Sequence, residues 1–400
     1  MREEQIKLAA PEYLKQFSCM AGDCPDTCCA GWDIVFDEAA CARYAADEHM
    51  RHELDSHVFR NTAAAADGSV PFARVRLTPE GCCPYLREDR LCAIQWMSEE
   101  ENLSETCRTH PRVIHLWKEK YAEEALHISC PQAARLILES SVPMRFFERN
   151  VPDEELKGLR LEAKGTELAP QSHKLRNFVI FLLQQQEYAL EDRIRLADHF
   201  LRRGMNLCGA AREKVMGLVH EYMRLLEKPE QVHDFLTAQG TSGSQLEILR
   251  SLIFHRLRSA AVSEVFDGLV RVFMERYQLS ERQAVNEAQV SLYEADLASA
   301  RNVIQRQYPF MLENYFVNQV FRELYFTGDS QDKARWRSLV FQFILQRALL
   351  AAAVAADGQL LAEAVDLMQK TAKAIEHNSL YLQQANDFLS MLEEGGIRML

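Results

Sequence analysis

The sequence lacks the glycine-rich turn, G-x-G-x-x-G after a strand, that marks a Rossmann-type nucleotide site. It also lacks the excess of basic residues expected of a general nucleic-acid-binding protein. Its 46 Lys and Arg residues are outnumbered by 58 Asp and Glu residues, which gives a net charge of −12. Because nucleic-acid backbones are met by Lys and Arg patches, we expect no nucleic acid among the partners.

Signals for export and for a membrane span are also missing. No apolar segment with a small-residue cleavage site follows Met1, so we expect a cytoplasmic protein. The most apolar stretch, residues 339–356, contains Gln342, Gln346 and Arg347, which is typical of a buried helix and not of a membrane span. In a reducing compartment, clustered thiols indicate metal or redox chemistry in preference to disulfides.

Cysteine is almost missing from the last two thirds of the chain and abundant before it. Ten of the 11 cysteines lie in residues 19–130, and only Cys208 lies later. Cysteines used as small buried hydrophobes would be scattered along the whole chain. The segregation therefore predicts a thiol site in the first third, whereas Cys41 and Cys208, on predicted helical stretches, are interpreted as packing residues.

The first thiols have the spacing C-x4-C-x3-C-C, which matches neither a zinc finger nor the ferredoxin run. Thiolates bind both zinc and iron–sulfur clusters. No histidine lies in residues 19–48, which favours sulfur-only ligation and a cluster over zinc, with a structural zinc as the alternative. Since neighbouring side chains on an extended backbone point to opposite faces, Cys28 and Cys29 are not expected to share one corner of a site. At least one of them is expected to bind metal.

Local patterns predict a mainly α protein in two domains. The charged residues 87–90 separate two apolar segments, which predicts a β-hairpin that brings Cys83 and Cys92 side by side. Short strands are expected at residues 32–36 and 71–77, and Asp37 is expected to cap a helix. From residue 142 onward, apolar residues recur at helical spacing without intervening strands. We therefore predict a cysteine-cluster domain with a few short strands, residues 1–141, and an all-α domain, residues 142–400, that completes a cofactor and substrate cleft.

Several short motifs occur in order across residues 13–136. They are Phe17-Ser-Cys19, Cys24-Pro-Asp-Thr-Cys28-Cys29, Gly31-Trp32-Asp33-Ile34, Cys83-Pro-Tyr-Leu86, Leu91-Cys92-Ala-Ile94, Leu103-Ser-Glu-Thr-Cys107, Pro111-Arg112 and Ser129-Cys130-Pro131. This set resembles the flagellin lysine-N-methylase family, and it is similar to zinc- or iron-chelating domains built on clustered cysteines. A fainter likeness continues at residues 313–318 and 321–322. His110 departs from the family, which more often has an aromatic residue before Pro-Arg.

The resemblance implies a cytoplasmic enzyme that methylates lysine ε-amines of flagellin before export. It implies S-adenosylmethionine as methyl donor and a four-iron four-sulfur (4Fe-4S) cluster, with zinc as the alternative. The cysteines that match the family pattern are the candidate metal ligands: Cys19, Cys24, Cys28, Cys29, Cys83, Cys92, Cys107 and Cys130. The roles open to the cluster are a structural staple, a ligand site for the cofactor's amino and carboxyl groups, and an electron relay.

Two sets of residues are candidates for cofactor binding. Trp32 is a candidate for stacking on adenine, and its alternative role is to brace the cysteine loop. The second set is Glu313, Asn314, Tyr315 and Asn318, in which Tyr315 and Asn318 share one helical face; the alternative is helix packing. Neither a Rossmann turn nor the C-x3-C-x-x-C loop of radical enzymes is present, so the family resemblance implies a largely helical, non-Rossmann cofactor pocket.

The catalytic residues stay unassigned at this level. The rival hypothesis is a non-enzymatic metal-binding or redox-sensing protein whose helical domain docks a partner.

Overall fold

The chain forms two compact units. The structure is a computed structural model of the 400 residues, and it describes residues 5–32, 34–60, 72–97, 102–117, 120–156, 161–162, 167–237, 242–259 and 264–399. Unit 1 comprises Met1–Leu136, Phe146–Lys164 and Gln369–His377, and unit 2 comprises Ile137–Arg145, Gly165–Met368 and Asn378–Leu400. Unit 1 therefore takes in two segments from beyond residue 142, the position at which the sequence pattern changes to helical.

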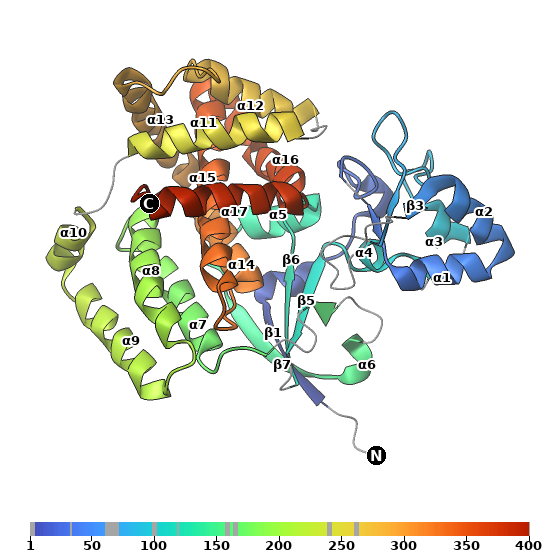
Figure 1. The fold of residues 1–400 in the computed structure, drawn as a ribbon, viewed down its shortest axis with the longest axis horizontal. Coiled ribbons are helices and arrows are strands. Elements are labelled where there is room, and N and C mark those ends of the chain that lie inside the picture. Colours follow the sequence, from blue (N-terminus) through green and yellow to red (C-terminus); the bar gives the residue numbers. More distant parts are fainter. Residues whose placement is uncertain are drawn as a thin grey trace. The chain divides into compact units, whose positions relative to one another are not determined.

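A mixed five-stranded sheet forms one part of unit 1, and its strand order is β7-β1-β6-β5-β8 (Figure 1). Strand β1 pairs parallel with β6 and antiparallel with β7, and β5 pairs antiparallel with β6 and parallel with β8. The sequence patterns did not predict this sheet, because β1 has no partner close to it in the chain. The strands are β1 (Gln5–Pro11), β5 (Arg112–Trp117), β6 (Tyr121–Leu126), β7 (Phe146–Pro152) and β8 (Leu161–Glu162).

The cysteine-bearing part of unit 1 contains short helices and a small sheet of order β2-β4-β3. The predicted strands at 32–36 and 71–77 are present in shorter form as β2 and β4, and residue 71 lies outside the described residues. The Asp37 carboxylate accepts a hydrogen bond from the Ala40 backbone N–H, which confirms the predicted helix cap. The elements are η1 (Glu12–Gln16), η2 (Ala21–Asp23), β2 (Val35–Phe36), α1 (Glu38–Ala46), α2 (Glu48–His57), β3 (Val58–Arg60), β4 (Ala73–Val75), α3 (Ala93–Met97) and α4 (Glu105–Thr109). Helices α5 (Pro131–Leu138) and α6 (Asp153–Leu156) follow.

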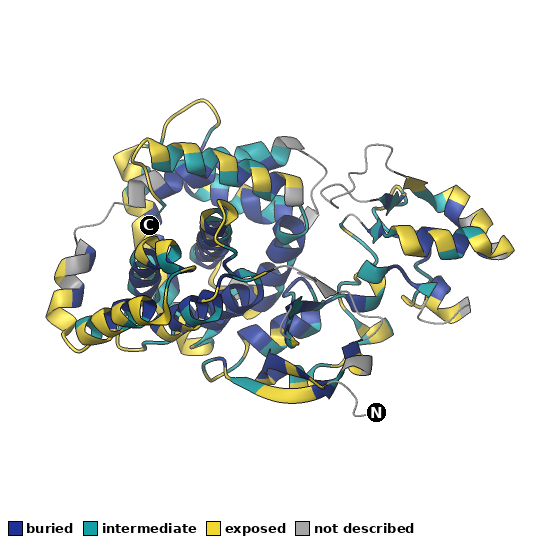
Figure 2. Ribbon diagram, turned by 60° about the horizontal axis from the view of Figure 1, so that its bottom comes forward, coloured by how far each residue is buried: buried dark blue, intermediate teal, exposed yellow. Residues whose placement is uncertain are grey.

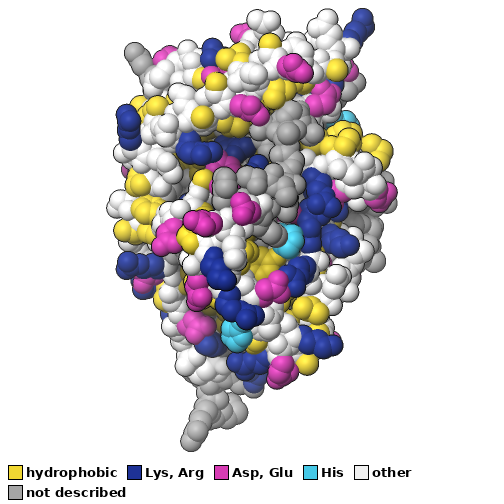
Figure 3. All heavy atoms as spheres, turned by 90° about the vertical axis from the view of Figure 1, so that its left-hand side faces the viewer, with side chains coloured by type: hydrophobic (Ala, Val, Ile, Leu, Met, Phe, Trp, Pro, Cys, Tyr) yellow, Lys and Arg dark blue, Asp and Glu magenta, His cyan; other side chains and the backbone are white. Residues whose placement is uncertain are grey.

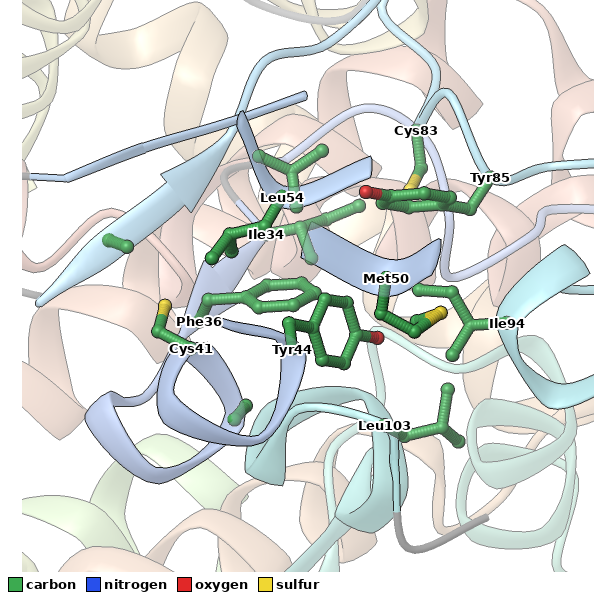
Figure 4. Packing of buried hydrophobic residues seen from close by; sticks show 13 residues of the cluster. Ile34, Phe36, Cys41, Tyr44, Met50, Leu54, Cys83, Tyr85, Ile94 and Leu103 are labelled. Carbon is green, nitrogen blue, oxygen red and sulfur yellow. The ribbon is translucent and has the colours of Figure 1, made fainter. Parts of the chain in front are cut away.

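A small hydrophobic core holds these short elements together (Figure 4). Phe36 packs edge-on against Tyr44, with ring centroids 5.4 Å apart. Cys41 is 1% exposed in this core, as its interpretation as a packing residue requires. Cys83 is also buried in it, and Cys29 and Cys92 pack against it. The cysteine-bearing part thus has a core of its own, and three of the candidate ligands line that core.

Unit 2 consists of helices whose inward faces are buried and whose outer faces are exposed (Figure 2). Its described helices are α7 (Ser172–Leu183), α8 (Leu190–Gly204), η4 (Met205–Leu207), α9 (Arg212–Leu226), α10 (Pro229–Thr237), α11 (Ser242–Ser259), α12 (Glu264–Arg276), α13 (Glu287–Gln307), α14 (Met311–Glu323), α15 (Gln331–Ala356), η5 (Gly358–Glu363) and α17 (Ser379–Glu394). Helix α16 (Ala364–Glu376) begins in unit 2 and ends in unit 1. The prediction of a mainly α fold, with short strands confined to the N-terminal part and to residues 146–162, is confirmed.

Helix α15 lies at the centre of unit 2. Among the described helices it alone is long and apolar enough to cross a membrane by those two criteria, and 83% of its apolar window is buried inside the protein. Gln342, Gln346 and Arg347 are buried with it. The Gln346 amide donates to the Met368 carbonyl at 2.9 Å, and Arg347 pairs with Glu191 at 2.9 Å. These contacts satisfy the polar groups inside a protein core, as the sequence predicted for this stretch.

Candidate functional site

The second group of cysteines is assembled by backbone pairing. The Cys83 N–H donates to the Cys29 carbonyl at 2.7 Å, which joins the two cysteine segments. Leu86 forms an isolated antiparallel bridge with Cys92, and the Arg87 N–H donates to the Leu91 carbonyl at 2.9 Å. The predicted hairpin therefore forms as a tight turn without extended strands, and it carries Cys92 back beside the Cys83 segment.

The thiols of this group shift one another's ionisation. Burial raises the pKa of Cys83 to about 12, and the nearby Cys29, Cys107 and Cys92 thiols raise it further. Desolvation also raises the pKa of Cys92, and Cys29 adds to the shift. Cys107 is exposed as a residue, but its sulfur is desolvated and lies near Cys29 and Cys92, and its pKa is raised to about 12. Buried neighbouring thiols resist ionisation because each new thiolate repels the next one.

The cysteine doublet is a coupled pair. The Cys28 thiol donates a hydrogen bond to the Cys29 sulfur, which lowers the pKa of Cys29 and raises that of Cys28. The Lys373 ammonium adds to the lowering at Cys29. The first proton to leave this pair therefore leaves a thiolate on Cys29, which the Cys28 thiol and a cation stabilise.

A second set of thiols lies around the loop that begins at Cys19. The Cys24 thiol donates to the Asp26 carbonyl at 3.2 Å, and the Ala21 N–H donates to the Cys19 sulfur at 3.4 Å. Burial raises the pKa of Cys130, and the Cys24 and Cys19 thiols contribute to the shift. These three sulfurs are thus electrostatic neighbours, although Cys130 lies more than 100 residues from the loop.

The last turns of α16 hold this loop, and the sequence reasoning missed them. Lys373 forms an ion pair with Asp26 at 2.7 Å and donates to the Thr27 carbonyl at 3.0 Å. The Gln369 amide donates to the other Asp26 oxygen at 2.9 Å and to the Ser129 carbonyl at 2.6 Å. Gln369, Lys373 and His377 recur every four residues along one face of the helix. That polar spacing is the one signal in the sequence that sets this face apart from the packing face.

Aromatic rings surround the same loop. The Trp32 indole N–H donates to the Cys28 carbonyl at 2.7 Å, so Trp32 braces the cysteine loop. Its ring lies 4.2 Å from that of His377 and 5.1 Å from that of His110, between centroids. Burial lowers the pKa of His110 to about 4, and the Lys373 charge lowers it further. The stacking of Trp32 on an adenine ring stays a prediction.

A histidine and a carboxylate form a pair beside this aromatic group. His127 Nδ1 lies 3.1 Å from the Glu376 Oε2 atom, and the Glu376 side chain is 3% exposed. His377 Nε2 lies 2.8 Å from the Ser129 hydroxyl, and its ring lies 4.8 Å from that of His127. A buried carboxylate fixes the orientation and the tautomer of an imidazole and favours its protonated form. His127 therefore has the surroundings of a proton acceptor.

The four predicted cofactor residues of the helical part all lie in α14, inside unit 2. Glu313 accepts from Arg193 and from Gln186, each at 2.6 Å. Asn314 accepts from the Met144 N–H at 2.8 Å and donates to the Val142 carbonyl at 3.0 Å.

Two further residues of α14 belong to the same set. Gln319 donates to the Tyr315 hydroxyl at 3.3 Å. Tyr315 and Asn318 are both 0% exposed. All four predicted residues thus lie in a packed core, and their role in cofactor binding stays a prediction.

A cavity of about 390 Å³, including its opening to solvent, lies inside unit 2 between α8, α15 and α17. Asp198 on its wall accepts from the Trp336 indole N–H at 2.9 Å and pairs with Arg202 at 2.6 Å. Arg337 pairs with Glu393 at 3.3 Å. These charges are already paired within the protein, and none of the predicted site residues lines the cavity. We assign no function to it.

Comparisons with known proteins identify the family. Residues 176–397, more than half of the chain, match the FliB lysine N-methylase C-terminal domain. The chain belongs to the FliB lysine N-methylase family. It is 31% identical over 153 residues to the lysine-N-methylases of Salmonella typhimurium and Salmonella choleraesuis, a match that covers 37% of this chain and 36% of each relative. A flagellar biosynthetic protein FliU of Salmonella muenchen is 30% identical over 151 residues, which cover 36% of this chain and 85% of the relative. No solved structure matches the chain.

The thiols of this FliB-family protein suit a metal site in kind and in location. Eight candidate ligands lie in one unit, and several of them have raised pKa values. Within the described ranges, no three Cys, His, Asp or Glu side chains stand close enough together to hold a metal ion as they are. Metal binding releases thiol protons and draws the sulfurs to about 2.3 Å from the metal. The donor set therefore fits a thiolate-bound metal, and its sulfurs would draw together on binding.

Proposed function

We propose that this FliB-family protein is a protein-lysine N-methyltransferase that uses S-adenosylmethionine to methylate lysine ε-amines of flagellin. The observation that carries the proposal is the match of residues 176–397 to the FliB lysine N-methylase C-terminal domain. The names of the Salmonella relatives, lysine-N-methylase and flagellar biosynthetic protein, support the reaction and the choice of flagellin. We further propose that the protein acts in the cytoplasm, where flagellin is present before export.

Methyl transfer to lysine requires an amine that has lost its proton. The nitrogen lone pair then attacks the sulfonium methyl carbon in line with the carbon–sulfur bond, and the electrons of that bond remain on sulfur. An ammonium group has no lone pair to offer, so a base near the site must take its proton first. We assign this role to His127, because the buried Glu376 carboxylate stabilises the imidazolium that results.

The fold supports a non-Rossmann site for the methyl donor. A Rossmann fold requires a doubly wound parallel sheet with a glycine-rich turn at a helix N-terminus. The five-stranded sheet of unit 1 is mixed, and two of its four pairings are antiparallel. We therefore propose that the donor binds beside the thiol site, where Trp32 and the neighbouring imidazoles offer aromatic faces.

The thiols would hold the proposed 4Fe-4S cluster, with ligands drawn from the eight candidate cysteines. When bound, a cluster would supply a Lewis-acidic iron and a route for electrons. Lys373 would place a positive charge next to the thiolates, since it holds the Asp26 carboxylate and the Thr27 carbonyl. This cation would offset the negative charge that thiolate ligation brings into a buried site.

The decisive assay is methylation of purified flagellin. Protein prepared without oxygen is incubated with flagellin and methyl-labelled S-adenosylmethionine, and the label is located by mass spectrometry of flagellin peptides. We expect label on lysine, and we expect it to depend on the protein. A protein that only binds metal or senses redox state would give no methyl incorporation at any redox potential. That result would refute the proposed function.

A further inference from the structure

The candidate ligands fall into two groups in space, although their spacing along the sequence suggests one. Backbone contacts join Cys29, Cys83 and Cys92 at the small core of the cysteine-bearing part. A different set of contacts brings Cys130 to the loop of Cys19 and Cys24. We propose that Cys29, Cys83, Cys92 and Cys107 form a closed structural zinc site of their own, separate from the site that the other thiols serve.

The first group is fixed by four short segments that converge. The Cys83 N–H donates to the Cys29 carbonyl at 2.7 Å, and the turn from Leu86 to Cys92 returns the chain to the same place. Cys107 lies in α4, whose first turn is anchored to the core helix α1. There the Glu105 N–H donates to the Asp37 carboxylate at 2.7 Å. Each sulfur of this group also raises the pKa of at least one other member, in keeping with their proximity.

An unpartnered buried hydroxyl points to a ligand at the same place. Tyr44 is 1% exposed, and its hydroxyl has no hydrogen-bond partner in the described part of the chain. Figure 4 shows this hydroxyl directed toward Met50 and Ile94, and Ile94 lies two residues after Cys92. The neighbouring Cys107 and Cys92 thiols, after burial and Tyr85, raise the pKa of Tyr44. A buried hydroxyl without a partner costs about 1–3 kcal/mol, and a metal-bound thiolate would accept its proton in a hydrogen bond.

The second group is held by different contacts. The Gln369 amide nitrogen contacts both Asp26 and the Ser129 carbonyl, so it places the residue before Cys130 against the first cysteine loop. The Cys19 and Cys24 thiols raise the pKa of Cys130, whereas the largest thiol effects on Cys83 come from Cys29, Cys107 and Cys92. Cys28 lies between the groups, with Cys29, Cys107 and Cys19 as thiol neighbours. The second group therefore has three thiols of its own and shares access to a fourth.

Zinc suits the first group better than a reactive cluster does. Structural zinc sites are closed, tetrahedral and commonly built from four cysteines. The cysteine-bearing part has only short helices and strands of two or three residues around its small core. Parts of this size commonly need a bound metal for stability. The second group lies instead beside Lys373, His110, His377 and Trp32, where a ligand would have polar neighbours.

Metal analysis of cysteine variants tests the separation without reference to methylation. The full-length protein is prepared without oxygen from cells supplied with zinc and iron, and both metals are measured per chain. We expect about one zinc ion per chain in the wild type. A Cys19→Ser/Cys24→Ser/Cys130→Ser variant should keep this zinc and lose its iron. Cys83→Ser and Cys92→Ser should lose zinc, and Cys82→Ser, which changes the neighbouring thiol outside the group, should keep it.

The triple variant keeps the test decisive even if loss of zinc unfolds the Cys83→Ser and Cys92→Ser proteins. Wild-type protein without zinc would overturn the proposal, as would loss of zinc together with iron in the triple variant. Soluble Cys83→Ser protein that retains its zinc would also overturn it.

Tyr44→Phe gives a second readout. This variant should release zinc to a chelator several-fold faster than wild type, because the thiolate loses its hydrogen-bond donor. An unchanged rate would remove Tyr44 from the site. If metals segregate as expected but flagellin stays unmethylated, the proposed function fails and the zinc site stands.

Discussion

The buried ion pair between Glu313 and Arg193 allows a stability prediction that also tests the role of α14. Both side chains are at most 5% exposed, and the charged atoms lie 2.6 Å apart. Glu313→Ala would leave the Arg193 guanidinium buried with only the Leu183 carbonyl as a nearby acceptor, at 2.6 Å. Removing one partner of a buried pair costs about 3–5 kcal/mol, because the remaining charge is uncompensated. We therefore expect the free energy of unfolding of unit 2 to fall by about 4 kcal/mol.

The measurement is urea unfolding of the full-length protein, followed by circular dichroism of its helices. Glu221→Ala is the matched control, because Glu221 pairs with Arg203 in the same unit with both side chains about half exposed. An exposed pair contributes about 0–1 kcal/mol, so this control should unfold almost as wild type does. Glu313→Gln keeps a carbonyl that can accept from Arg193, and it should fall between the two.

A loss from Glu313→Ala no larger than that from the control would refute the reasoning. If such a stable variant also lost methylation activity, Glu313 would act in the reaction, as the sequence motif suggests. If the large loss is found, the likeness at residues 313–318 to the flagellin lysine-N-methylases is explained by core packing.

Three further predictions concern the cysteine loop and its neighbours. Lys373→Met removes the cation held by Asp26, and urea unfolding should show a loss of about 2 kcal/mol for a hydrogen-bonded charge, with Lys373→Arg less affected. Because burial lowers the pKa of His110 to about 4 from 6.5, the unfolded chain binds a proton that the native state refuses; stability should therefore fall as pH drops from 6.5 to 4, and His110→Asn should flatten this slope. Gly31→Ala should destabilise by about 1 kcal/mol in thermal unfolding because φ is +79° there. Gly268→Ala, in helix α12 with open space around it, should stabilise by a similar amount, and the same sign for both would contradict this assignment.

Local patterns predicted the elements that depend on nearby residues. The helical spacing from residue 142 onward identified the helices of unit 2, because a helix buries one face whatever it packs against. The Asp37 cap and the turn between Cys83 and Cys92 were predicted for the same reason. Each of these features is determined by residues within about ten positions of one another.

The contacts that sequence reasoning missed join distant segments. Lys7 in β1 pairs with Tyr121 in β6 and with Asn150 in β7, and no local period records such a pairing. Lys373 and Asp26 are 347 positions apart. The cysteine spacing likewise combined all the thiols into one site, because it does not contain the backbone contacts that separate Cys83 from Cys130.

The most direct test of the proposed function is mass spectrometry of flagellin after incubation with this protein and methyl-labelled S-adenosylmethionine. The proposal predicts a gain of methyl groups on lysine that requires the protein, and it predicts less methylation with His127→Gln, whose amide cannot take up the proton of the substrate amine. Flagellin that carries no label after incubation with the metal-loaded protein would contradict it.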